Sequence, residues 1–215
     1  MMLMQDRPRE DIELKVDWCS HAAVKYACTN WHYSRAVPAG SLLKIGAWEN
    51  GVFIGCVLFS HGANLHIGNP YGMTQFEAVE LTRIAMTTHV TPVTQIVSRA
   101  LRMLKQQCPG VKLVVSFADT DQEHIGGIYQ AGNWIYTGLA GKNTMSAFII
   151  HGKKTHPKTV YSRGWMSSIK WLRENIDPNA EIFITGGKHK YLYPLDKKTR
   201  KAIIHLSKPY PKKDE

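Results

Sequence analysis

The stretch Leu113–Gly138, LVVSFADTDQEHIGGIYQAGNWIYTG, constrains the fold more than any other part of the chain. Leu113–Phe117 is a short apolar, branched run of the kind that forms a strand buried on both faces. The polar side chains of Ser116, Asp119 and Asp121 gather at its end. A buried strand that opens into a polar loop is where α/β folds place their chemistry.

The second half of this stretch predicts a helix and a further strand. His124–Ala131 has helix-forming residues, and Gly132-Asn133 is a typical helix stop. Trp134–Thr137 is aromatic and branched, as edge and core strands often are. The order strand, polar loop, short helix, strand therefore favours a mixed α/β fold.

Similar patterns predict the other elements of a single domain over 1–215. Asn50-Gly51 joins two apolar runs and indicates a tight hairpin. We expect Ser146–His151 to pair with Trp134–Thr137, and residues 153–158 to form a basic loop. The expected strands are Ile12–Val16, Leu42–Trp48, Val52–Ser60, Phe76–Met86, Ser146–His151, Ile182–Thr185 and Lys188–Pro194, and the expected helices are Cys19–Trp31, Pro92–Gln107, Trp165–Ile176 and Lys197–Leu206.

Charge is concentrated in the last third of the chain. The net charge is +10, and residues 151–215 hold 15 Lys and Arg against 6 Asp and Glu. Such an excess favours a polyanionic partner, most simply DNA, because each neutralised phosphate releases counterions. The alternative is a solvated basic tail. The candidate DNA contacts are Lys153, Lys154, Lys158, Arg163, Lys188, Lys190, Lys197, Lys198, Arg200 and Lys201.

Several protein classes are disfavoured by composition. The apolar runs, such as Val52–Phe59, are too short to span a membrane, and Met1–Glu10 is too charged for a signal peptide. The four cysteines are scattered without a CxxC pair, so neither a disulfide framework nor a zinc knuckle is indicated. We expect a soluble cytoplasmic protein.

Two further clusters place polar groups near predicted elements. His32 ends a predicted helix within the string Trp31–Arg35, where it suits a general base, a metal ligand or a helix-capping cation. Glu80 and Arg83 lie in a strand that should be covered. Because a buried unpaired charge is costly, these two residues must either face a pocket or form a structural ion pair.

Four strings in this order, HYSR, ELTR, SFAD and GGIYQAGNWIYTG, together resemble the Mom proteins of bacteriophages. The resemblance covers residues 12–150 and implies a GNAT-like fold, with a strongly twisted mixed sheet flanked by helices and a basic C-terminal extension. It implies an enzyme that converts adenine in double-stranded DNA to a methylcarbamoyl form and so protects the DNA from restriction. Residues 12–150 would be the catalytic core, and 151–215 would complete the sheet and contact DNA.

The implied reaction defines which side chains a site needs. The exocyclic amine of adenine is a poor nucleophile and needs a base, for which His32, Asp119 and Tyr129 are candidates. An extruded adenine needs aromatic walls and a polar edge. We therefore assign catalysis to His32, Tyr33, Glu80, Arg83, Ser116, Asp119 and Tyr129, and substrate binding to Arg35, Gln130, Asn133, Trp134 and Tyr136. Core packing of Trp134 and Tyr136, and a plain turn at Asp119, are the competing explanations.

The cofactor stays open at this point. Acetyl-CoA-binding members of the fold carry a Gly-rich loop after the central strand, whereas Thr87–Pro92 contains no glycine. Threonine hydroxyls and a helix capped by Thr91, with Pro92 at its first position, can still hold an anion, so acetyl-CoA is allowed but not indicated. His32, Glu80 and Asp119 form a set suited to iron or another divalent metal. The alternatives are an acetyl-CoA-dependent N-acyltransferase and a non-catalytic DNA-binding protein.

Overall fold

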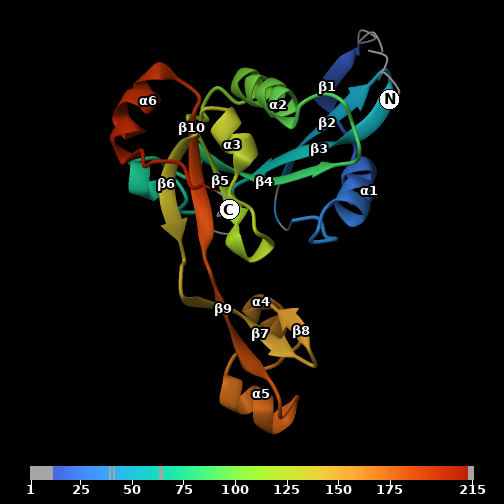
Figure 1. Ribbon diagram of the computed structural model, residues 1–215, viewed down its shortest axis with the longest axis vertical. Helices are drawn as coiled ribbons and strands as arrows, with labels where there is room; N and C mark the ends of the chain where they lie inside the picture. The colour runs from blue at the N-terminus through green and yellow to red at the C-terminus, as the bar shows by residue number, and fades with distance from the viewer. Residues whose placement is uncertain (1–11, 39, 41, 63–64, 213–215) are drawn as a thin grey trace, which may run out of the picture. The chain divides into compact units, whose positions relative to one another are not determined.

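The structure, a computed structural model, describes residues 12–38, 40, 42–62 and 65–212 (Figure 1). The chain divides into two compact units. The core unit comprises the described residues up to Phe117 together with Gly127–Thr137 and Tyr191–Tyr210. The small unit comprises Ala118–Gly126, Gly138–Lys190 and the residues that follow Tyr210.

The core unit is built on a seven-stranded sheet with the order β1-β2-β3-β4-β5-β10-β6. Its strands are β1 (Leu14–Trp18), β2 (Leu42–Glu49), β3 (Val52–Ser60), β4 (Ala78–Met86), β5 (Leu113–Asp119), β6 (Ile135–Ala140) and β10 (Lys188–Pro194). Strands β1 to β4 are antiparallel neighbours, and β4 and β5 are parallel. The predicted hairpin is present, with Asn50 and Gly51 in the left-handed conformation that its turn requires.

Helices cover this sheet, and α1 and α2 lie on opposite sides of it (Figure 1). The helices are α1 (His21–Trp31), α2 (Val93–Gln107), α3 (Gly127–Ala131) and α6 (Lys197–Ile203), with single 3-10 turns at Asn69–Tyr71, Thr120–Gln122 and Ile204–Leu206. Ser20 caps α1 by accepting from the Ala23 amide at 3.1 Å. Ala27 and Cys28 of α1 pack against Cys56 and Leu58 of β3, which anchors this helix to the sheet.

The small unit has its own sheet and apolar core. Strands β7 (Thr144–Ile150), β8 (Lys153–Thr155) and β9 (Glu181–Thr185) form a sheet with the order β8-β7-β9. Helices α4 (Pro157–Ser162) and α5 (Ile169–Asn175) supply Val160 and Leu172, which pack with Phe148 and Ile150 of β7. These residues form a small apolar core within this unit.

Three expectations about this region were wrong. The strand expected at Ser146–His151 does not pair with Trp134–Thr137, because β10 occupies the place beside β6 and β7 pairs with β8 and β9. The expected basic loop 153–158 contains β8 and the start of α4, where His156 caps the Lys158 amide. The helix expected from Trp165 begins only at Ile169.

The expected fold class is confirmed: the chain forms a mixed sheet flanked by helices, with a basic region following. All four cysteines are free thiols, and Cys28 and Cys56 are buried. Among the described residues, no helix has the length and apolarity needed to cross a membrane.

Candidate active site

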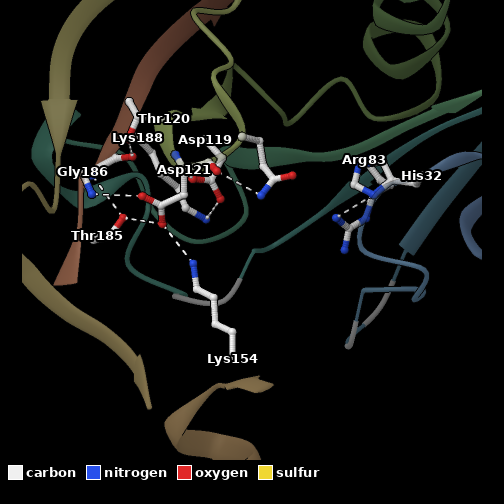
Figure 2. A network of polar contacts seen from close by, with 11 residues as sticks. His32, Arg83, Asp119, Thr120, Asp121, Lys154, Thr185, Gly186 and Lys188 are labelled. Atoms are coloured by element: carbon white, nitrogen blue, oxygen red, sulfur yellow. Dashed lines mark hydrogen bonds and ion pairs between the residues drawn. The ribbon is translucent and has the colours of Figure 1, made fainter. Parts of the chain in front are cut away.

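His32 lies at the end of α1, and its contacts determine which ring nitrogen carries the proton. Nδ1 faces the Ser34 amide at 3.1 Å and Nη1 of Arg83 at 3.4 Å (Figure 2). Because both groups are N–H donors, Nδ1 must be the unprotonated acceptor, and a neutral ring carries its proton on Nε2. His32 therefore presents an N–H group at its outer nitrogen.

Arg83 reaches His32 from β4. Its Nη1 contacts the imidazole ring, while its buried Nε has no hydrogen-bond partner among the described residues. None of the ion pairs in the described part of the chain includes its guanidinium. Arg83 therefore contacts the His32 ring rather than a carboxylate of the described residues.

Ser116 and Tyr129 form a buried hydroxyl pair in the same unit. Ser116, on β5, lies 2.8 Å from the Tyr129 hydroxyl of α3 and donates to the Leu81 carbonyl at 3.0 Å. Burial, with smaller contributions from the nearby charges of Glu80 and Tyr33, raises the pKa of Tyr129 to about 12, although the hydrogen bond with Ser116 lowers it in part. Tyr129 therefore keeps its phenolic proton at neutral pH.

Glu80 closes the cluster from β4. Its carboxylate lies so close to the backbone of Gly62 that a Cβ added at Gly62 would collide with Oε2 of Glu80. Gly62 also has a φ of +72°, which disfavours any other residue there. The core unit thus contains six of the seven expected catalytic residues, and Gly62 is a supporting residue that the sequence analysis missed.

The seventh, Asp119, belongs to the small unit and has partners there. Its carboxylate accepts from the Asp121 amide at 3.1 Å and forms an ion pair with Lys188 at 3.6 Å (Figure 2). The first contact is the Asx-type turn that the sequence allowed, and the second orients the carboxylate. Asp119 therefore lies beside a cation and caps the turn that follows β5.

Asp121, which was not among the expected site residues, links several segments of the small unit by hydrogen bonds. Its carboxylate accepts hydrogen bonds from Lys154, Thr185 and Gly186, each at 3.0 Å, and Figure 2 shows Lys154 reaching it from β8. Burial opposes ionisation, but these hydrogen bonds lower the pKa of Asp121 overall. Its only sequence signal was its place beside Asp119.

The expected substrate-binding residues are dispersed over the core unit. Arg35 donates to the Thr29 and Asn30 carbonyls at 3.0 and 2.8 Å, and so caps the end of α1. The rings of Trp134 and Tyr136 are buried in an aromatic cluster with Tyr129, Tyr191 and Tyr193. Gln130 donates to the Tyr191 hydroxyl at 3.2 Å, and Asn133 adopts the left-handed turn after α3. Packing and capping thus account for much of this set.

The basic residues also divide between the units. In the core unit, Lys197, Lys198, Arg200 and Lys201 are exposed on α6. In the small unit, Lys154 and Lys188 pair with Asp121 and Asp119, and Arg163 lies over the Trp165 ring. Burial lowers the pKa of Lys190, whereas Lys153 and Lys158 are exposed. The exposed cations are the ones available to phosphates.

The turn before α2 is held by a carboxylate from another part of the chain. The Glu49 carboxylate of β2 accepts from the Thr91 amide at 2.6 Å and from the Val90 amide at 3.2 Å. Burial opposes ionisation, yet the hydrogen bonds from Thr91 and Val90 lower the pKa of Glu49. Pro92 occupies the cap position of α2 without a side-chain cap bond, so the expected capping by Thr91 is wrong. A carboxylate of the chain therefore occupies two backbone amides of the turn before α2.

No group of three or more His, Cys, Asp or Glu side chains that could hold a metal ion occurs among the described residues. The possible metal set named from the sequence is divided between the units, with His32 and Glu80 in the core unit and Asp119 in the small unit.

Known proteins share this architecture. A mutant of SpeG, a spermidine N-acetyltransferase from Vibrio cholerae, superposes with a TM-score of 0.50 at 8% identity over 88% of this chain and 96% of that one. YncA, a putative acetyltransferase from Salmonella typhimurium solved with acetyl-CoA, gives a TM-score of 0.47 at 11% identity over 86% and 95% of the two chains. At such identities the likeness concerns the fold alone.

Sequence comparison is more specific. The methylcarbamoylase Mom of Escherichia phage Mu is 24% identical over 209 residues, which span 93% of this chain and 84% of that protein. The sequence model of the Mom protein family matches residues 13–212, well beyond the 12–150 over which the four motifs lie. The chain therefore belongs to the Mom protein family.

Proposed function

We propose that this protein is a phage-type DNA modification enzyme that converts adenine in double-stranded DNA to a methylcarbamoyl adenine. Membership of the Mom family and the methylcarbamoylase activity for which its phage Mu relative is named support the reaction class. The observation that carries the proposal is the presence of His32, Arg83, Ser116 and Tyr129 as two contacting polar pairs in the core unit. A non-catalytic DNA-binding protein would not require polar pairs of this kind.

We propose a different role for each of the three candidate bases, supported by the contacts of each. His32 accepts at Nδ1, so it acts through its Nε2 proton as a hydrogen-bond donor toward developing negative charge. Tyr129 keeps its proton at neutral pH because burial raises its pKa to about 12. Asp119, which belongs to the small unit, is retained as the candidate general base for the amine proton. Arg83, whose Nε is unsatisfied among the described residues, is suited to bind an oxygen of the transferred group.

The reaction requires an acetamide or acyl donor. In acetyl-CoA-binding folds, free amides at the start of a helix hold the pyrophosphate. Here Glu49 occupies the Val90 and Thr91 amides, and the turn has no glycine. We therefore propose a donor that does not depend on a pyrophosphate cradle at this turn, which disfavours the acetyl-CoA-dependent alternative.

Duplex DNA is the proposed partner, bound through the exposed cations. If Lys197, Lys198, Arg200 and Lys201 neutralise phosphates, their joint replacement by Gln should weaken binding about equally for all DNA sequences. The salt dependence should also flatten, by a slope of about 0.9 for each phosphate that is no longer neutralised. Binding with an unchanged affinity and slope would remove α6 from the DNA interface.

Protection from restriction is the cellular test of this proposal. Plasmid DNA from cells that express the protein should resist endonucleases whose recognition sites contain adenine, whereas DNA from cells with the empty vector should be cut. A second control, Ser116→Ala, should restore cleavage if it accumulates as folded protein. Full cleavage of DNA from cells containing the folded wild-type protein would count against the proposal.

A further inference from the structure

A pocket of about 570 Å³ lies in the core unit, where the end of β10 meets α6. Its wall includes Lys105 at the end of α2, Tyr193 of β10, and Lys197 and Arg200 of α6. Its volume falls within the range of about 300 to 1,000 Å³ that small-molecule sites occupy. None of the expected catalytic residues lines it.

The charge of this pocket favours an anion. Lys105, Lys197 and Arg200 form no ion pair in the described part of the chain, and the fourth charged group of the wall is Asp196. Asp196 is already engaged, because it caps α6 by accepting from the amide and hydroxyl of Thr199 at 2.7 and 2.8 Å. The wall therefore has three cationic donors and a net charge of about +2.

Helix geometry separates the cations of α6 into two groups. Residues at positions i, i+3 and i+7 share one face of a helix, and Lys197, Arg200 and Ile204 have this spacing and line the pocket. Lys198 and Lys201 are equally exposed but do not line it. Because Lys198 and Lys201 are also proposed DNA contacts, the control cations are taken from other elements: Lys25 of α1 and Lys170 of α5 are exposed and do not line the pocket.

Aromatic rings form part of the same wall. Tyr193 packs on the buried Trp134 ring, with centroids 5.1 Å apart, and is itself partly open to solvent. Tyr210 is 41% exposed, and its hydroxyl donates to the Trp134 carbonyl at 2.6 Å, which holds the ring in place. Exposed rings beside cations are suited to nucleobases, because a base stacks on the ring while its phosphate meets the charges.

No expected catalytic residue lines the pocket, although its wall includes Asn133 and Trp134 of the expected substrate-binding set, and the Trp134 ring packs on Tyr129 with centroids 5.0 Å apart. Leu195, in its wall, donates its amide to the Lys112 carbonyl at 2.8 Å, just before β5 begins. Ser116 lies four residues further along this extended segment, which corresponds to about 13 Å. A ligand here would therefore bind at a second site of the core unit.

We propose that this pocket binds a nucleotide, with its phosphate on Lys105, Lys197 and Arg200 and its base against Tyr193 and Tyr210. The nucleotide can belong to a DNA strand or be a free mononucleotide, since both have the same chemistry. This inference concerns binding alone and does not depend on the proposed modification reaction.

Calorimetric titration of the full chain with adenosine 5′-monophosphate tests the proposal. We expect saturable one-to-one binding, weakened about tenfold or more in the double variant Lys197→Gln/Arg200→Gln, because the neutral side chains no longer make charge-assisted hydrogen bonds to the phosphate. Lys25→Gln/Lys170→Gln removes the same charge from exposed positions outside the pocket and should change the affinity less than about twofold. Equal weakening in both variants, or no binding by the wild-type protein, would overturn the proposal.

Two further titrations define the ligand. Tyr210→Leu should weaken binding of the mononucleotide but leave binding of inorganic phosphate unchanged, because only the stacking surface for the base is removed. If Tyr210→Leu bound the mononucleotide like the wild type, the stacking half of the proposal would fail. Competition with duplex DNA separates the two sources: displacement of the mononucleotide assigns the pocket to DNA, and simultaneous binding assigns it to a free nucleotide.

Discussion

The backbone amide of Ser34 donates a hydrogen bond to Nδ1 of His32 at 3.1 Å, and this contact fixes the tautomer of the ring. Nη1 of Arg83 approaches the same nitrogen at 3.4 Å, which reinforces the assignment. A histidine with a free lone pair on its outer nitrogen would be a base, whereas this one offers a proton. The proposed mechanism depends on this difference.

The first prediction follows from that tautomer. Nitrogen chemical shifts of the His32 ring should show the proton on Nε2 at neutral pH. His32→Ala should lower DNA modification by about 100- to 10,000-fold, the usual range for a positioned proton donor or acceptor. His32→Gln, whose amide can donate from a similar place, should retain more activity than His32→Ala. A ring protonated on Nδ1 would refute the assignment.

The second prediction concerns the Ser116 and Tyr129 pair. Ser116→Ala leaves a buried Tyr129 hydroxyl without its partner and should cost about 1–3 kcal/mol of unfolding free energy. Tyr129→Phe should cost less, because Ser116 still donates to the Leu81 carbonyl. The double variant should be more stable than the sum of the two single effects predicts. Strict additivity in denaturant unfolding would show that the two hydroxyls do not interact.

The pKa of Tyr129 adds a pH dependence to this pair. Because burial raises its pKa to about 12, the folded protein keeps the phenol proton at a pH where the unfolded chain, at about 10, has released it. The stability contribution is present below about pH 10 and is lost as the pH rises toward 12. Tyr129→Phe should therefore reduce the decline in stability over this alkaline interval, as measured by denaturant unfolding at a series of pH values.

The third prediction separates two neighbouring carboxylates. Asp119→Asn is nearly isosteric and keeps an acceptor for the Asp121 amide, so the fold and DNA affinity should persist while modification falls. Asp121→Ala should instead destabilise the small unit, since it removes the acceptor for Lys154, Thr185 and Gly186. Thermal unfolding and modification assays on both variants distinguish these outcomes. Full modification activity in Asp119→Asn would remove Asp119 from the mechanism.

The lowered pKa of Asp121 predicts how the stability difference between Asp121→Ala and the wild type changes at low pH. Its ionised form is stabilised in the folded state, so its contribution is present above the ordinary carboxyl pKa and is lost as the pH falls through the lowered value. Asp121→Ala should therefore differ most from the wild type near neutral pH. The difference should shrink in acid.

The fourth prediction concerns the donor. Since Glu49 holds the Val90 and Thr91 amides, acetyl-CoA should bind weakly or not at all to the wild-type protein in calorimetry. Glu49→Gln keeps the size of the side chain but removes its charge, so phosphate-bearing ligands should meet less repulsion and bind more tightly than in the wild type. A tight stoichiometric complex of the wild type with acetyl-CoA would show that this turn accepts pyrophosphate despite Glu49.

Local signals in the sequence predicted local structure well. The Asn50-Gly51 turn predicted the hairpin because few other residues adopt its backbone, and the alternation of Lys188–Pro194 predicted β10 with its observed bounds. The expected helix Cys19–Trp31 is present as α1, which begins at His21. Each of these features depends on residues close together in the chain.

Features that depend on distant partners could not be predicted in this way. The partner of β7 was missed because β10, about forty residues later in the chain, takes the place beside β6. The Glu49 contact joins two segments 41 residues apart, and nothing in either segment indicates the other. The contact between His32 and Arg83, which helps to set the tautomer of the His32 ring, likewise arises only when α1 and β4 come together.

Nucleoside mass spectrometry of DNA from cells expressing the protein tests directly whether it modifies adenine. We predict a deoxyadenosine species with the added mass of a methylcarbamoyl group, present with the wild type and absent with folded His32→Ala. An unchanged nucleoside profile, in cells where the wild-type protein is folded and abundant, would contradict it.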